Sequence, residues 1–181
     1  MNIFYLHHDP VECAKLHNDK HVVKMILEYG QLMSTAHRVL DGTPYYGKTA
    51  NNRNIKRWLL PDFREDILWK ASHVNHPSGI WTRDNSDNYT WLYNLWHNLL
   101  DEYTYRYGKI HSADRMKTCF AMLPSNIPRV TKQFYEPTPA MPDKYKVANN
   151  SIESYKNYYL GDKQHLASWK KRDVPSWYVI N

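Results

Sequence analysis

Apolar residues recur at every third or fourth position over about residues 11–40, which is the spacing of one face of an α-helix. Asp9-Pro10 precedes this segment as a helix-start signal, and Asp41-Gly42 follows it as a stop signal. The pattern predicts a long amphipathic first helix. Its expected core-facing residues are Val22, Met25, Ile26, Tyr29, Leu32, Met33, Ala36 and Leu40.

Most of the remaining sequence is also interpreted as helix. Further helices are predicted at about residues 61–74 and 85–107, the second closed by Gly108, with shorter ones at 112–121 and 151–160. Residues 2–6 are expected to form a short strand or an extended buried arm, and residues 124–142 a long ordered loop or a lid. We therefore expect a mainly α, compact, single-domain helical fold over residues 1–181, with little strand.

A line of polar residues follows the other side of the predicted first helix. It consists of His17, His21, Lys24, Glu28, Gln31, Thr35 and Arg38. Such a line is either a solvated face or an active-site stripe. Its apolar borders and its single carboxylate among basic and neutral groups favour a stripe within a groove. Glu28, with His21 and Lys24 as catalytic partners, could polarise a water, protonate a leaving group or stabilise a cationic intermediate.

Metal and phosphate-loop chemistry are disfavoured. His17 and His21 have the spacing of a metal-binding pair, but the Glu that follows the first His in zinc peptidases is absent. The six glycines do not form a phosphate-binding loop, and no serine elbow occurs. We expect neither a metal nor another cofactor.

Charge and aromatic content favour a nucleic-acid partner. The chain has 24 Lys and Arg against 18 Asp and Glu, giving a net charge of +6, and contains seven Trp and 15 Tyr. Basic residues at 38–64 and 106–115 could clamp phosphates on either side of a groove, although core packing and solvated lysines are an alternative. The predicted DNA-binding residues are His17, Gln31, Arg38, His76, Trp81, Arg83, Arg106, Lys109, Tyr155, Tyr158 and Tyr159.

The expected setting is a reducing cytoplasm. Cys13 and Cys119 are too few and too far apart to indicate a disulfide framework. Residues 1–6 are too short for a signal sequence, and no apolar run approaches the roughly 18 residues that cross a bilayer. We expect a monomer that associates with no membrane and acts in the host cytoplasm if a phage encodes it.

Three features of the chain resemble the phage pyrimidine-dimer DNA glycosylase family, also called endonuclease V. They are Asp19, His21 and Glu28 on the first helix, a His-led turn entering an aromatic helix at residues 76–108, and Tyr-Lys-x-Tyr-Tyr at 155–159. They follow the family's order over about half of the chain. The resemblance implies a helical fold with Glu28 as catalytic carboxylate, His21 and neighbouring cations holding duplex DNA, and extrusion of a base.

The N-terminus departs from that family, whose nucleophile is the α-amine exposed after removal of the initiator Met. Asn2 is bulky enough that Met1 should stay. The Met1 amine could replace that nucleophile if the extended arm brings it beside Glu28. The leading hypothesis is therefore a phage-type DNA glycosylase and lyase acting on a damaged or modified base. The alternatives are a transferase that modifies a DNA nucleobase, and a non-enzymatic protein that binds DNA or blocks a host factor.

Overall fold

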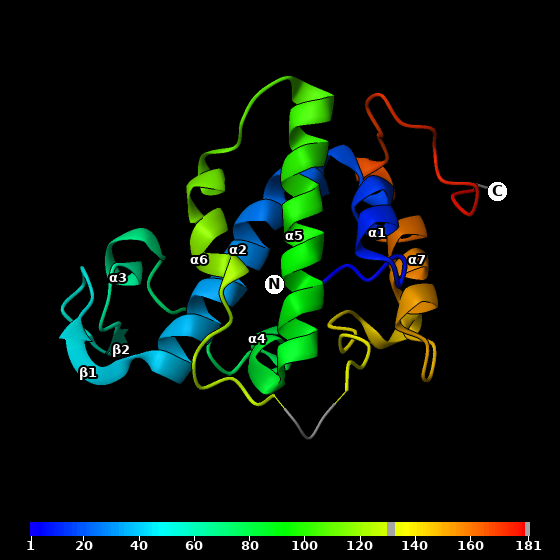
Figure 1. The fold of residues 1–181 in the computed structure, drawn as a ribbon. Helices are drawn as coiled ribbons and strands as arrows, with labels where there is room; N and C mark the ends of the chain where they lie inside the picture. Colours follow the sequence, from blue (N-terminus) through cyan, green and yellow to red (C-terminus); the bar gives the residue numbers. More distant parts are fainter. Residues whose placement is uncertain (130–132, 180–181) are drawn as a thin grey trace.

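The computed structural model describes residues 1–129 and 133–179, and the fold is mainly helical (Figure 1). Its α-helices are α1 (Pro10–Leu16), α2 (Asp19–Asp41), α3 (Arg64–Ile67), α4 (Pro77–Asp84), α5 (Ser86–Tyr107), α6 (Lys117–Ala121) and α7 (Ser151–Leu160). A hairpin of β1 (Thr43–Lys48) and β2 (Asn54–Leu59) follows α2. Short 3₁₀ turns are η1 (Ser112–Met116), η2 (Asp143–Tyr145) and η3 (Gln164–Leu166).

Helices α2 and α5 cross at the centre of the molecule and α1 and α4 pack against them (Figure 1). Gly30 lets two indole rings approach α2, because a Cβ at this position would lie 2.9 Å from Trp69 and 3.4 Å from Trp96. The Trp96 Nε1–H donates to the Ile26 carbonyl oxygen at 2.9 Å, which ties α5 to α2. The core-facing residues predicted for α2 are buried, apart from the half-buried Leu40.

The predicted first helix is interrupted, because His17 and Asn18 have extended backbones between α1 and α2. Asn18 Oδ1 accepts from the His21 backbone N–H and caps α2. The His17 carbonyl oxygen accepts from the buried Arg106 guanidinium at 2.9 Å and not from an N–H of a continuing helix. The prediction of one continuous helix is therefore wrong, because the backbone at His17 bonds a distant guanidinium. His17 does not belong to the polar stripe of α2.

The helix predicted at residues 61–74 is reduced to the four residues of α3. The backbone extends from Leu68 onward, where the carbonyl oxygens of Leu68 and Trp69 accept from the Arg38 guanidinium at 2.8 and 2.6 Å. Those carbonyls are thus committed to a side chain of α2 and not to helical bonds. The helix predicted at 112–121 is divided into η1 and α6, whereas α5 and α7 match their predictions closely.

The Pro-rich segment at residues 124–142 contains no helix or strand among its described residues, and positions 130–132 lie outside them. Trp81 Nε1–H donates to the Tyr135 carbonyl oxygen at 2.9 Å, and Ile127 and Met141 are buried. The described part is therefore an ordered loop attached to the helical core. No helix in the described chain combines the length and apolar character needed to cross a bilayer.

Gly42 permits the close passage of β2 past the end of α2. A Cβ built there would lie 2.5 Å from the Arg38 carbonyl oxygen of α2, 2.9 Å from the Trp58 Cβ and 3.2 Å from the Leu59 carbonyl oxygen. Gly42→Ala is expected to lower the free energy of unfolding by about 1–3 kcal/mol through this overpacking. Urea denaturation measures the change, with Gly47→Ala as control, since a Cβ at Gly47 meets nothing closer than 3.6 Å. Equal effects in both variants would contradict the prediction.

Candidate active site

The N-terminal arm is extended and buried, as one of the two sequence interpretations expected. Residues 3–6 are almost fully buried. The Phe4 backbone N–H donates to the Tyr29 hydroxyl at 3.0 Å, and Ser78 Oγ donates to the Met1 carbonyl oxygen at 2.9 Å. Two helices, α2 and α4, therefore hold the arm and fix the position of its terminal amine.

The Met1 amine lies beside Glu28. Its nitrogen is 3.9 Å from Glu28 Oε2, while Lys24 Nζ is 3.1 Å from Glu28 Oε1. The Glu28 side chain is 20% exposed and the Lys24 side chain 65%, so the carboxylate is recessed below its cation. The helical spacing of Lys24 and Glu28 accounts for one contact, and the buried arm supplies the other. The amine, carboxylate and ammonium form a compact polar cluster.

His21 forms the floor next to this cluster. Its Nδ1 is 2.7 Å from the Tyr159 hydroxyl, and its ring packs 4.1 Å from the ring of Phe4. Burial, followed by the charges of His17, Lys163 and Lys24, lowers the pKa of His21 to about 2. His21 is therefore neutral at ordinary pH. If the Tyr159 hydroxyl donates to Nδ1, the ring proton resides on Nε2 and can serve a substrate.

Two cavities meet at this floor. The smaller, of about 100 Å³, is lined by Met1, Asn2, Phe4, His21, Lys24, Met25, Glu28 and Lys163. The larger, of about 590 Å³, is lined by Asp19, Lys20, His21, Val23, Lys24, Tyr107, Lys163 and Leu166. His21, Lys24 and Lys163 belong to both linings. The larger volume lies within the range of ligand pockets, and the smaller one suits only a few atoms beside the amine.

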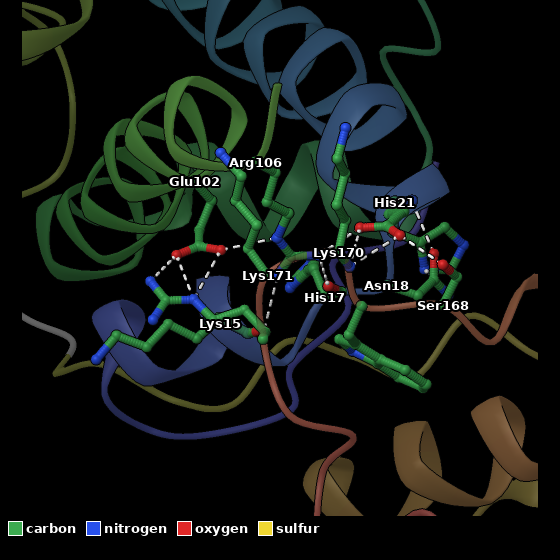
Figure 2. A network of polar contacts seen from close by, with 12 residues as sticks. Lys15, His17, Asn18, His21, Glu102, Arg106, Ser168, Lys170 and Lys171 are labelled. Carbon is green, nitrogen blue, oxygen red and sulfur yellow. Dashed lines mark hydrogen bonds and ion pairs between the residues drawn. The ribbon is translucent and has the colours of Figure 1, made fainter. Parts of the chain in front are cut away.

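Arg106 is the centre of a buried network behind the larger cavity (Figure 2). Its guanidinium donates to Glu102 at 2.9 Å, Asp19 at 3.0 Å and the Lys15 and His17 carbonyl oxygens at 2.9 Å each. Figure 2 shows Glu102 and Arg106 of α5 close to Lys15 of α1, with Ser168 and Lys170 of the C-terminal segment in the same network, where both bond Asp19 of α2. Arg106 is thus fully enclosed by protein acceptors, which corrects the prediction that it binds DNA.

His17 is likewise a buried structural residue. Its Nδ1 donates to the Cys13 carbonyl oxygen at 2.7 Å and its Nε2 accepts from the Tyr29 hydroxyl at 3.1 Å. Burial lowers its pKa to about 4, so the ring is neutral and carries no charge that could attract a phosphate. The predicted DNA contact of His17 is corrected accordingly.

Four further predicted DNA contacts are corrected by burial. Arg38 is fully buried and bonds carbonyl oxygens of residues 58–68 together with Glu65. Trp81 is 1% exposed, and its indole N–H is taken by the loop. The ring centre of Tyr155 lies 5.4 Å from that of Phe4 in the core. The Tyr159 hydroxyl is 2.7 Å from His21 Nδ1 and is therefore occupied inside the protein. None of these side chains reaches a surface that a duplex could contact.

The other predicted DNA-binding residues remain accessible. Lys109 is exposed, while Gln31, His76, Arg83 and Tyr158 are half-buried. Burial, and next the positive charge of the Met1 amine, lowers the pKa of His76, which lies within electrostatic reach of the amine and Glu28. Gln31 Nε2 donates to the Lys70 carbonyl oxygen at 2.8 Å. These five stay candidates for DNA contact.

Sequence reasoning missed Lys163, Lys20 and Tyr107 as site residues. Lys163 follows α7 and lines both cavities, with its Nζ 4.9 Å from the centre of the Tyr158 ring. The Tyr159–His21 contact, which joins residues 138 positions apart, brings the end of α7 to α2, and no local sequence pattern predicts it. Within residues 1–129 and 133–179, no group of three or more His, Cys, Asp or Glu side chains could hold a metal ion.

The geometry thus joins a terminal amine, a carboxylate, a neutral imidazole and lysines at the junction of two cavities. Comparison with known proteins found no match for this chain among family models, curated proteins or solved structures.

Proposed function

We propose that the protein is a DNA base-excision enzyme of the glycosylase and lyase type, whose nucleophile is the Met1 α-amine. The observation that supports this proposal is the 3.9 Å separation between the amine nitrogen and Glu28 Oε2. A nucleophile within reach of a proton acceptor is the recurring geometry of covalent catalysis. The adjoining cavity of about 590 Å³ would receive the extruded base, while the deoxyribose lies over the amine.

The proposed reaction proceeds through an imine between the Met1 nitrogen and the deoxyribose. The unprotonated amine nitrogen attacks C1′ of the deoxyribose, the glycosidic bond breaks, and the base leaves with the bonding electrons and takes up a proton. Glu28 accepts the proton that the attacking nitrogen loses, and opening of the sugar ring leaves an imine between Met1 and C1′. Loss of a C2′ proton then expels the 3′ phosphate, and water hydrolyses the imine to regenerate the amine.

Borohydride trapping tests this proposal directly. Hydride reduces the imine to a stable secondary amine, so duplexes with a damaged or modified pyrimidine should yield a covalent complex. Peptide mapping should assign the link to Met1, and intact mass should establish that Met1 is the first residue of the protein used. A matched sample whose α-amine is acetylated should form no adduct. Absence of both adduct and strand cleavage over a panel of lesions would exclude the proposal.

A second candidate, a transferase that modifies a DNA nucleobase, is favoured by the paired cavities. The larger cavity has the volume of a small-molecule pocket and shares its wall with the amine site, so it could hold a second reactant. This activity predicts an increased nucleoside mass in digested DNA without abasic sites. Nucleoside mass spectrometry after incubation therefore separates the transferase from the glycosylase.

A further inference from the structure

The hairpin of β1 and β2 projects from the helical body, at the end of α2 remote from α7 (Figure 1). Strand β1 leaves most of its side chains exposed, and β2 leaves half of them exposed. Residues 43–60 include no Asp or Glu, and their four cations are Lys48, Arg53, Lys56 and Arg57. An isolated hairpin with this composition gains little stability from its own burial, so its sequence calls for another explanation.

The register gathers cations and aromatic rings on one face of the hairpin. Tyr46 pairs with Lys56, Pro44 with Trp58 and Lys48 with Asn54, and directly opposed residues lie on the same side of a two-stranded sheet. Tyr46 is 78% exposed, and Lys56 Nζ lies 5.3 Å from the centre of the Trp58 ring. Interleaved cations and aromatic rings suit phosphates and bases together.

The exposed cations of the hairpin form no ion pair with a described carboxylate. Lys48, Arg53 and Lys56 have no ion-pair partner within the described part of the chain, whereas Arg64, Arg106 and Arg172 are all paired with carboxylates. Arg57 is half-buried and donates to the Ala71 carbonyl oxygen at 3.4 Å. The hairpin therefore presents to a polyanion three positive charges that no described carboxylate neutralises.

The hairpin connects with the candidate active site through the 71–75 segment. A cavity of about 430 Å³ is lined by Ile55, Lys56, Trp58, Ala71, Ser72, His73, Val74 and Asn75. The His76 backbone N–H donates to the His73 carbonyl oxygen at 2.9 Å, and Ser78 Oγ donates to the Met1 carbonyl oxygen at 2.9 Å, so the chain leads from this segment to the N-terminal arm. Along α2, the distance from Glu28 to the hairpin is roughly 20 Å at 1.5 Å per residue.

We propose that the β1–β2 hairpin is a DNA-binding arm, which holds duplex DNA flanking the nucleotide at the amine. A two-stranded ribbon fits the major groove, and the separation of roughly 20 Å corresponds to about six base pairs at 3.4 Å each. Lys48, Arg53 and Lys56 contact phosphates, and Tyr46 packs against the sugar and base edges. The inference rests on the proposed function for its substrate, a DNA duplex.

The test measures equilibrium binding of a fluorescein-labelled unmodified duplex of about 24 base pairs, long enough to span both regions. The triple variant Lys48→Ala, Arg53→Ala, Lys56→Ala should raise the Kd at least about tenfold in moderate salt. The slope of log K against log salt should shrink by about 0.9 for each cation that is removed. Tyr46→Ala should raise the Kd without changing the slope, since no charge is lost.

The matched control removes three lysines outside the hairpin, Lys117→Ala, Lys144→Ala and Lys146→Ala, which pair with local aspartates. Its Kd should change less than about twofold. Equal weakening in both triple variants, or an unchanged Kd in the hairpin variant, would overturn the inference. Hairpin-dependent binding without a borohydride adduct would reject the proposed chemistry alone. Adduct formation with hairpin-independent binding would reject the arm alone.

Discussion

Glu28→Gln is expected to reduce the single-turnover rate of borohydride-trapped adduct formation by about 10²–10⁴-fold, the usual contribution of a general acid or base. The amide has nearly the shape of the carboxylate and can still bond Lys24, which lies 3.1 Å from Glu28 Oε1. It cannot accept the proton that the Met1 nitrogen must lose. The loss should therefore appear in the rate and not in the Kd for DNA.

The matched control is Glu12→Gln, since Glu12 also pairs with a lysine on its own helix, at 2.7 Å from Lys15. That variant should retain the wild-type rate. Both should unfold at nearly wild-type temperature, because the Glu12 ion pair is exposed and contributes little, and the glutamine amide at position 28 keeps the shape of the carboxylate and its bond to Lys24. If Glu28→Gln leaves every DNA-dependent effect of the protein intact, the chain acts as a non-enzymatic binding protein. A rate loss shared by Glu12→Gln would point to general charge effects.

Local sequence signals predicted the helices whose ends are set by capping residues adjacent in sequence. Asn85 and Asn150 cap α5 and α7, and Gly108 ends α5 with a φ of 66°, so these boundaries are determined within a few residues. The contact between Lys24 and Glu28 also followed from their helical spacing. Where a residue's environment is set by its neighbours in sequence, pattern analysis was sufficient.

The two wrong helix predictions share one physical cause, the burial of arginines by distant backbone. Arg38 and Arg106 look like surface cations in a polar pattern, but carbonyl oxygens from residues 58–69 and 15–17 enclose them. The same contacts interrupt the first helix and unwind the second. The hairpin escaped prediction because its exposed strands show no alternation of apolar and polar residues. The position of the Met1 amine depends on the fold of the whole arm.

Acidification is expected to unfold the protein well above the pH at which carboxylates protonate. Burial lowers the pKa of His17 and His37 to about 4 and that of His21 to about 2. In the unfolded chain these rings titrate near 6.5. Between pH 6.5 and 4 the unfolded state therefore binds protons that the folded state cannot. Each histidine lowers stability by up to about 1.4 kcal/mol per pH unit as the pH falls.

The three together remove on the order of 5 kcal/mol by pH 5, a large part of the roughly 5–15 kcal/mol that stabilises a domain. Above pH 6.5 the rings are neutral in both states and stability should level off. Circular dichroism melts between pH 7.5 and 5 should show the midpoint fall by about 10–20 °C. A midpoint that stays constant over this range would mean that the three rings are accessible to protons in the folded protein.

His37→Gln isolates one of these contributions. His37 Nε2 lies 2.7 Å from the Tyr89 hydroxyl and Nδ1 accepts from Arg64 at 2.9 Å, so the ring serves as a neutral bridge beside a fixed cation. A glutamine amide offers the same donor and acceptor without a titrating group. The pH slope of unfolding should drop by up to about 1.4 kcal/mol per pH unit, the share of one histidine, whatever the variant's absolute stability. His165→Gln, at an exposed position, should keep the wild-type slope. A wild-type slope in His37→Gln would assign the acid sensitivity to other groups.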